Sequence, residues 1–308
     1  MRLMSELNRF FKSKKMAATL KPTFLKCLLD IGDCKREEGS QWVNQTQNDY
    51  EVDLNFVAVR FIRYYWPLKF IFKIKQAATS APLAAYGVLD DFSGLTGKKS
   101  CPSKKKLCKN KFAEMRLAMI RDGIKPQVLK KLLNDCNIYS VPRGSNSIII
   151  SKETVNFMKE NKNILVSALN NTIAEYLEGF NLSPNISRCL KEVTPRTKLR
   201  TPVFEKIIEM QSSCCFYCGN EGREFAQEHV IPWNFVRATQ IHNIVAACTP
   251  CNGSKHDSLP AKKYLDKVLE RNQSLESLPA GYSREMMENL YENCRIEYHG
   301  KEERLWEP

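Results

Sequence analysis

Four cysteines in the C-terminal third of the chain have the spacing of a zinc site. Cys215 and Cys218 form one CxxC pair, and Cys248 and Cys251 form a second pair after 29 intervening residues. Cys214 is excluded from the predicted metal ligands, because Cys215 is the residue that makes the CxxCG knuckle with Cys218. Two such knuckles bring four thiolates to about 2.3 Å from one tetrahedral ion. Because four sulfur ligands leave no open coordination position, we expect this Zn²⁺ to hold the fold and take no part in chemistry.

Residues between and just beyond these pairs suit phosphodiester hydrolysis. That reaction needs an activated water and a cation to stabilise the charge on the phosphate and the leaving oxygen. His229, with an ordinary pKa of about 6.5, can accept a proton from water at neutral pH. Glu228 and Asn252 offer hard oxygen ligands to a divalent cation. If residues 251–257 begin a helix, Asn252 and His256 are i and i+4 on one face, and His256 is a third ligand.

These residues resemble the motif of HNH endonucleases. The resemblance spans about residues 201–275 and is carried by EHVIPW at 228–233, by Asn243, and by CNGSK at 251–255. It implies a β-hairpin followed by a helix, the ββα-metal fold, around one catalytic metal ion. It further implies that His229 is the general base and that Asn243 braces the loop and orients it.

Two positions depart from the common motif. Glu228 stands where Asp is common, and Asn252 gives an HNN triad in place of HNH. Oxygen ligands with a single histidine suit Mg²⁺ or Mn²⁺ as the catalytic metal. We expect Lys255 to contact a phosphate of the substrate. His242 and His299 match no position of the motif and are left as surface or core histidines.

The net charge of +13 is unevenly distributed. Residues 201–308 contain 12 Lys and Arg against 16 Asp and Glu, a net charge of −4, and residues 1–200 hold the other 35 basic and 18 acidic residues, a net charge of +17. An excess of cations favours a polyanionic partner, because neutralised phosphates release condensed counterions. We therefore expect the first part of the chain to bind DNA.

The length of 308 residues favours two domains. We predict an α+β chain, with a basic, mostly helical DNA-binding domain at 1–195 and a nuclease domain at 196–308. Lys104, Lys105 and Lys106 form a charge run that either binds phosphates or is a solvated connection. The order helix, helix, hairpin, helix is that of a winged-helix element at 124–165, with a plain structural hairpin as the alternative. The aromatic stripe at 52–73 is interpreted as helix core in preference to a base-stacking surface.

No secretory signal and no apolar run long enough for a membrane span is recognised, so we expect a cytoplasmic, bacterial protein with reduced thiols. The sequence thus predicts a metal-dependent HNH endonuclease that cleaves DNA, with a resemblance to enzymes of restriction and anti-phage defence. A homodimer or partner subunits of a defence system would fit that role. The alternatives are a non-catalytic zinc-knuckle DNA-binding protein and an RNA-directed nuclease or toxin.

Overall fold

The computed structural model describes residues 2–12, 18–34, 39–77, 83–97, 100–190, 196–222, 224–275, 278–279, 281–300 and 302–308. The chain forms two compact units. Unit 1 comprises Met1–Phe180 and Leu190–Glu192, and unit 2 comprises Asn181–Cys189 and Val193–Pro308. The predicted boundary after residue 195 falls at 191–195, outside the described residues. Unit 2 also includes residues 181–189, which the sequence pattern assigned to the first domain.

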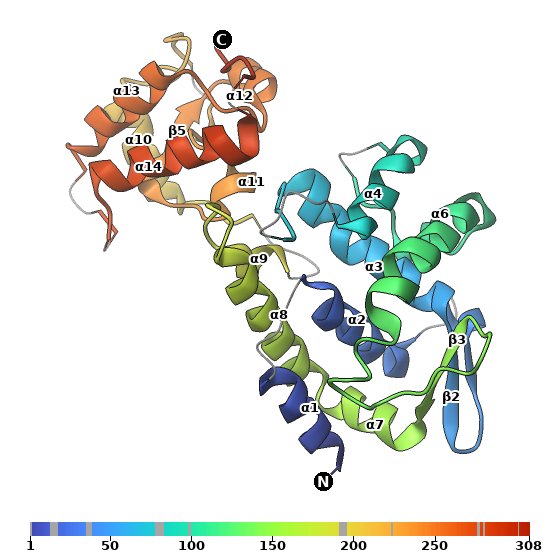
Figure 1. Ribbon diagram of the computed structural model, residues 1–308. Coiled ribbons are helices and arrows are strands. Elements are labelled where there is room, and N and C mark those ends of the chain that lie inside the picture. The colour runs from blue at the N-terminus through green and yellow to red at the C-terminus, as the bar shows by residue number, and fades with distance from the viewer. Residues whose placement is uncertain are drawn as a thin grey trace. The chain divides into compact units, whose positions relative to one another are not determined.

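Unit 1 is mostly helical (Figure 1). Its α-helices are α1 (Arg2–Lys12), α2 (Leu20–Leu29), α3 (Leu54–Trp66), α4 (Ala84–Asp91), α5 (Lys104–Leu107), α6 (Ala113–Ala118), α7 (Lys152–Glu160) and α8 (Lys162–Glu178). Two wider, π-helical segments extend α3 and α6, namely η4 (Pro67–Ile71) and η7 (Met119–Leu129). Short 3₁₀ turns are η1 (Ile31–Asp33), η3 (Ser40–Trp42), η5 (Ser93–Leu95) and η6 (Asn110–Phe112).

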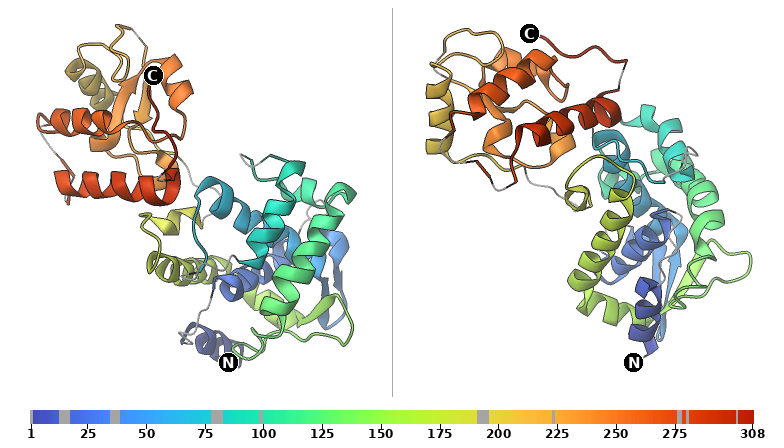
Figure 2. Two further views of the ribbon diagram at one scale, coloured as in Figure 1. Left: turned by 45° about the horizontal axis from the view of Figure 1, so that its top comes forward. Right: turned by 60° about the vertical axis from the view of Figure 1, so that its left-hand side comes forward.

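The sheet of unit 1 joins distant parts of the sequence. Strands β1 (Val43–Gln45), β2 (Asp49–Asp53) and β3 (Ser147–Ser151) lie side by side in that order and are antiparallel, the first two blue and the third green in Figure 2. β3 pairs with β2 along its whole length, and a single bridge at Ile149 joins it to Ser140. The structure therefore differs from the winged helix predicted at 124–165, because the strand's main partner comes from residues 49–53.

The core of unit 1 is built around α3. Asp53 caps this helix by accepting the N–H of Asn55 at 2.7 Å. Most of the aromatic stripe is buried, as the core interpretation predicted, with Tyr64 and Phe70 partly buried. Arg60 is buried within the stripe. Its Nε lies 3.2 Å from Asp30 Oδ2, and Lys162 Nζ lies 2.7 Å from Asp30 Oδ1. Arg60 thus serves the packing of unit 1 and does not face a nucleic acid.

Unit 2 contains a two-stranded antiparallel hairpin, β4 (Ala226–His229) and β5 (Ile244–Ala247). The helix α12 (Thr249–Lys255) follows β5 directly, with Pro250 in its first turn, where a missing N–H costs nothing. The predicted order of two strands and a helix is confirmed. Its other elements are α9 (Ile186–Cys189), α10 (Thr201–Met210), α11 (Trp233–Val236), η8 (Ile241–Asn243), α13 (Lys262–Asn272), α14 (Arg284–Cys294) and η9 (Arg295–His299).

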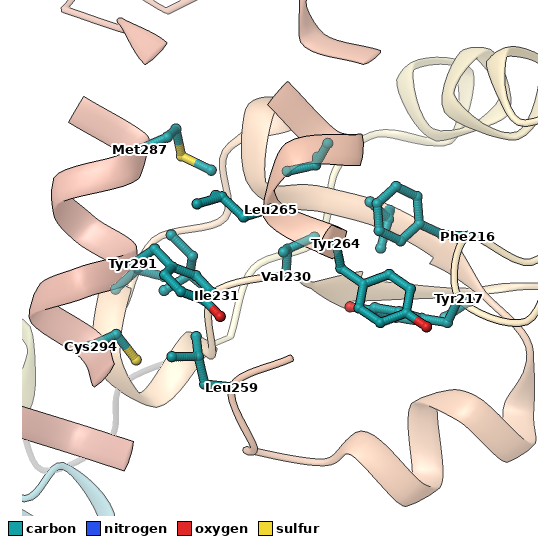
Figure 3. Close-up of a cluster of buried hydrophobic side chains, with 14 of the residues drawn as sticks. Phe216, Tyr217, Val230, Ile231, Leu259, Tyr264, Leu265, Met287, Tyr291 and Cys294 are labelled. Carbon is teal, nitrogen blue, oxygen red and sulfur yellow. The ribbon is translucent and has the colours of Figure 1, made fainter. Parts of the chain in front are cut away.

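Two clusters of buried side chains support the hairpin of unit 2. In the larger one, Val230 and Ile231, which follow β4, lie among residues of α13 and α14 (Figure 3). The smaller one consists of Ile207, Ile244 and Ala246, with Leu199 and Phe204 among the residues packed against it. The hairpin is thus fixed by apolar packing on two sides. No helix among the described residues combines the length and apolar character needed to cross a bilayer.

Candidate functional site

The four predicted zinc ligands lie together in unit 2. The sulfur atoms of Cys215, Cys218, Cys248 and Cys251 are all within 4.8 Å of one another, and those of Cys218 and Cys248 are 3.8 Å apart. Four sulfurs bound tetrahedrally at about 2.3 Å from one ion would lie about 3.8 Å from each other. The cluster is therefore positioned to hold a metal ion, and its all-sulfur ligand set suits zinc. Elsewhere in the described ranges, His, Cys, Asp and Glu side chains form no comparable group.

Backbone amides favour the thiolate form of Cys215. The N–H of Cys248 donates to Cys215 Sγ at 3.3 Å. Burial alone would raise the pKa of Cys215, but the backbone N–H groups of Cys248, Cys218 and Tyr217 outweigh it and lower the pKa to about 7. A thiolate is the form that binds a metal ion. Cys214 lies outside the cluster, as the CxxCG spacing predicted.

Glu228 and His229 occupy the last two positions of β4. The hairpin register sets Glu228 opposite Val245 and His229 opposite Ile244. Both side chains are buried, with exposed fractions of 4% and 3%. Two polar residues at a strand end in a packed interior need specific partners, since burial without them is costly.

The imidazole of His229 is held in its neutral form. Burial is the main reason that its pKa falls to about 3, and the positive charges of Arg196 and Lys255 add to the effect, while the Ala238 backbone opposes it. Nε2 lies 3.4 Å from Thr239 Oγ1. Nδ1 is buried and has no partner at hydrogen-bonding geometry among the described residues. The lone pair of Nδ1 is therefore unused, and the low pKa makes the imidazole a weak base in this environment.

Asn243 fastens the chain that follows His229. Its Oδ1 accepts the N–H of Ile231 at 2.9 Å, and its Nδ2 donates to the Ile231 carbonyl at 2.9 Å. The Asn243 carbonyl also accepts the N–H of Val230 at 3.0 Å. The side chain is buried. Three bonds to the two residues after His229 hold the strand end in place, which is the geometry required of the predicted brace.

The prediction that Lys255 contacts a phosphate is wrong, because the Lys255 side chain is completely buried. Its Nζ donates to Glu228 Oε1 at 2.7 Å and to the His229 carbonyl at 2.8 Å. Burial lowers the pKa of Lys255, and the Glu228 carboxylate acts in the opposite direction. Lys255 therefore ties α12 to the end of β4 from within the fold.

Asn252 and His256 do not share a helix face. The helix α12 ends at Lys255, and His256 has a φ of 49°, in the left-handed region. The His256 side chain is 66% exposed, with Nδ1 3.3 Å from Asp257 Oδ2. The prediction that a continuing helix would align His256 with Asn252 is wrong, because the backbone turns away at that residue.

A cavity of about 730 Å³ joins the remaining site residues. Glu228, His229 and Asn252 line it from β4 and α12. The segment 196–200 also lines it, with the cations Arg196, Lys198 and Arg200. The cavity thus combines an imidazole, a carboxylate and an amide with three positive charges.

The cations of segment 196–200 were missed as site residues, because they directly follow the predicted domain boundary at residue 195. A signal was present in the sequence: basic residues alternate with Thr197 and Leu199, at the period of an extended strand. The lysines that were predicted to bind nucleic acid, Lys104 to Lys106, lie in and around the short helix α5 of unit 1. They are not part of this cavity.

Residues 215–258 match the family model described as HNH endonuclease. The matched range contains the cysteine cluster together with Glu228, His229, Asn243 and Asn252. No curated protein and no solved structure matches the chain. The chain therefore contains an HNH endonuclease domain with four cysteines positioned to hold a metal ion.

Proposed function

Because residues 215–258 form an HNH endonuclease domain, we propose that the chain is a metal-dependent endonuclease that hydrolyses phosphodiester bonds of DNA. The observation that carries the proposal is the cavity in which His229, Glu228 and Asn252 meet. Phosphodiester hydrolysis requires a base for water and a stabiliser of negative charge, and this cavity offers a candidate for each.

His229 is the proposed general base, and Nδ1 is the atom that takes the proton. Nδ1 is buried and has no partner at hydrogen-bonding geometry among the described residues, so it is the ring nitrogen left to accept a proton. The low pKa keeps the imidazole neutral at neutral pH but also makes it a weaker base. A water molecule between Nδ1 and the phosphorus would lose its proton as it attacks, and the leaving oxygen would depart on the opposite side. Asn243 is the proposed brace, since its three bonds to Val230 and Ile231 limit movement of the strand end.

The donor set of the cavity fits a hard divalent cation. Glu228 uses Oε1 for Lys255, and Asn252 lines the same cavity. We propose that the Glu228 carboxylate and the Asn252 amide oxygen would hold Mg²⁺ or Mn²⁺. When bound, such an ion stabilises the negative charge that develops on the phosphate and the leaving oxygen. His256 is not included, because its side chain is exposed and beside Asp257.

The cysteine cluster is proposed to bind structural Zn²⁺. Four thiolates saturate a tetrahedral ion, so it has no position left for substrate. Unit 1 is proposed to select where the DNA is cut, which its net charge of +13 supports, namely the +17 of residues 1–200 without the four basic residues of that range that belong to unit 2. Restriction or anti-phage defence is the proposed setting, supported by the resemblance of the EHVIPW and CNGSK segments.

The test is a cleavage assay with purified protein. Supercoiled plasmid, single-stranded DNA and structured RNA would each be incubated with Mg²⁺, Mn²⁺ or EDTA, and the product ends sequenced. We expect cleavage of the plasmid that EDTA abolishes. Cleavage of RNA alone would contradict the assignment to DNA. DNA binding without cleavage under any metal would favour the non-catalytic zinc-knuckle alternative.

A further inference from the structure

We infer that the segment 196–200 is a phosphate-binding wall of the catalytic cavity, which holds the nucleic-acid backbone beside the bond to be cut. The inference rests on the proposed nuclease function and adds residues that bind the substrate. It also gives unit 2 a binding surface of its own, where the charge distribution of the sequence indicated none.

The segment 196–200 is anchored through its odd-numbered residues. The N–H of Leu199 donates to Gln227 Oε1 at 2.8 Å, and Gln227 Nε2 donates to the Leu199 carbonyl at 3.1 Å. Thr239 Oγ1 donates to the Thr197 carbonyl at 2.7 Å. The Leu199 side chain packs against the cluster of Ile207, Ile244 and Ala246. The segment is thus fixed along β4.

The anchored segment brings three cations to the cavity. All five residues of the segment line it, and Arg196, Lys198 and Arg200 are its exposed charged side chains. Residues two apart in an extended chain are separated by about 6.7 Å, close to the spacing of neighbouring phosphates along one nucleic-acid strand. This spacing therefore allows each of the three cations to contact one of three successive phosphates.

Of the three cations, Arg196 is at the end of the segment beside His229. Thr239 Oγ1 bonds the Thr197 carbonyl at 2.7 Å and lies 3.4 Å from His229 Nε2, whereas Leu199 pairs with Gln227. The Arg196 guanidinium lies 5.6 Å from the centroid of the Trp233 ring. The contact with Trp233 holds the guanidinium without using its N–H donors on a carboxylate. We assign Arg196 to the phosphate next to the scissile bond, and Lys198 and Arg200 to the phosphates beyond it.

The three cations lack acidic partners. Within the described ranges, no carboxylate forms an ion pair with Arg196, Lys198 or Arg200. The one carboxylate that lines the cavity, Glu228, is already bonded to the buried Lys255. Three like charges along one wall repel each other, and a polyanion relieves that repulsion. A phosphodiester backbone has the regular negative charge that this arrangement requires.

The test measures binding in the full-length chain with His229→Ala, so that cleavage does not interfere. Binding of a fluorescent DNA duplex would be titrated at several KCl concentrations for this protein and for a version with R196Q, K198Q and R200Q. A matched control carries K262Q, K263Q and R284Q, which remove three exposed charges of unit 2 outside the cavity. Zinc content and thermal unfolding would verify that each variant is folded.

We expect the wall variant to bind more weakly and to show a shallower dependence of log K on log [KCl], by about 0.9 for each lost phosphate contact and about 2.7 in all. The control should keep the parent slope. An unchanged affinity and slope in the wall variant would overturn the inference. Equal binding of polyglutamate and duplex at one ionic strength would assign the wall to an acidic protein segment and also overturn it.

Failure of this inference can be told apart from failure of the nuclease proposal. If wild-type protein cleaves DNA, and R196Q, K198Q and R200Q placed in the wild-type background leave both binding and cleavage unchanged, the phosphate wall is wrong and the nuclease stands. If the slope changes as expected but wild-type protein cleaves nothing with any metal, the wall stands as a nucleic-acid site and the nuclease proposal fails.

Discussion

Both units bury a cation beside a carboxylate, but with different surroundings. In unit 1, Asp30 is bonded through Oδ2 to Arg60 and through Oδ1 to Lys162, so the fold uses both of its oxygens. In unit 2, Lys255 Nζ donates one hydrogen bond to Glu228 Oε1 and another to the His229 carbonyl. The unit 2 carboxylate also lines a cavity, which His229 lines as well.

The comparison shows what a buried ion pair does and does not indicate. Pairing two buried charges mainly avoids the cost of leaving one alone, so the pair is weak evidence of function. Function is indicated by the groups around it: a proton-accepting nitrogen, an open volume and unpaired cations. Unit 2 has all three beside Glu228. The variants below would sharpen or break this contrast.

The largest effect is expected from loss of the cysteine cluster. Cys218 is exposed, so Cys218→Ser removes a metal ligand without disturbing the packed core. Structural zinc contributes about 10–16 kcal/mol in zinc-finger peptides, so unit 2 should lose its metal and much of its folded structure. Zinc analysis and hydrogen exchange read by mass spectrometry would measure this, with protection retained in unit 1.

Cys214→Ser is the matched control for this prediction. Cys214 neighbours the cluster without belonging to it, so zinc content and protection should stay at the wild-type level. Equal zinc loss in both variants would contradict the assignment of ligands.

The two buried pairs should differ in their effect on activity. Arg60→Met and Lys255→Met each leave a buried carboxylate with one partner fewer, which costs about 3–5 kcal/mol. Both should lower the free energy of unfolding in denaturant titrations. Lys255→Met should also slow DNA cleavage per folded molecule by about 10–100-fold, since Glu228 and the end of β4 lose their positioning group.

Cleavage rates for that comparison should be taken at a temperature where both variants remain folded. Arg60→Met should then cleave at the wild-type rate. If both variants lost cleavage equally, the contrast between the two pairs would be wrong.

A smaller effect is expected at acid pH in unit 1. Burial would raise the pKa of Asp30, but Arg60 and Lys162 together outweigh it and hold the pKa below its ordinary value. The resulting stability is present in full above the unfolded-state pKa of about 3.9 and is lost as the pH falls toward the lower pKa of the folded protein. Hydrogen exchange of unit 1 below pH 4 should follow this loss, and Asp30→Asn should remove that part of the pH dependence.

The sequence was sufficient for the parts of the site that depend on local spacing. The two CxxC pairs are a short-range pattern, and the structure brings the four cysteines together as expected. The hairpin and helix that the resemblance to HNH endonucleases implied are also present, while the brace role of Asn243 stays a prediction. The α+β class followed in the same way from local signals.

The remaining errors arise from long-range packing. Lys255 is a charged residue close to Cys251 in the sequence. Its neighbours in the sequence give no sign that its side chain is buried against Glu228. His256 was placed by extending a helix one residue too far, at a position where the backbone turns left-handed. The partner of β3 lies at residues 49–53, and such distant pairings leave little trace in a single sequence.

Four basic residues were also counted with the first domain although they belong to the second. Arg188, Arg196, Lys198 and Arg200 belong to unit 2, which brings that unit from the net charge of −4 counted for residues 201–308 to zero. Three of these four line the cavity. A net charge averaged over a domain therefore hid a local concentration of cations.

The central claim is that His229 removes the proton from the attacking water. The direct measurement is the single-turnover rate of plasmid cleavage with Mg²⁺ for wild-type protein and for His229→Ala. We predict a fall of about 10²–10⁴-fold, with DNA affinity and zinc content unchanged. A His229→Ala protein that cuts at the wild-type rate would contradict the account.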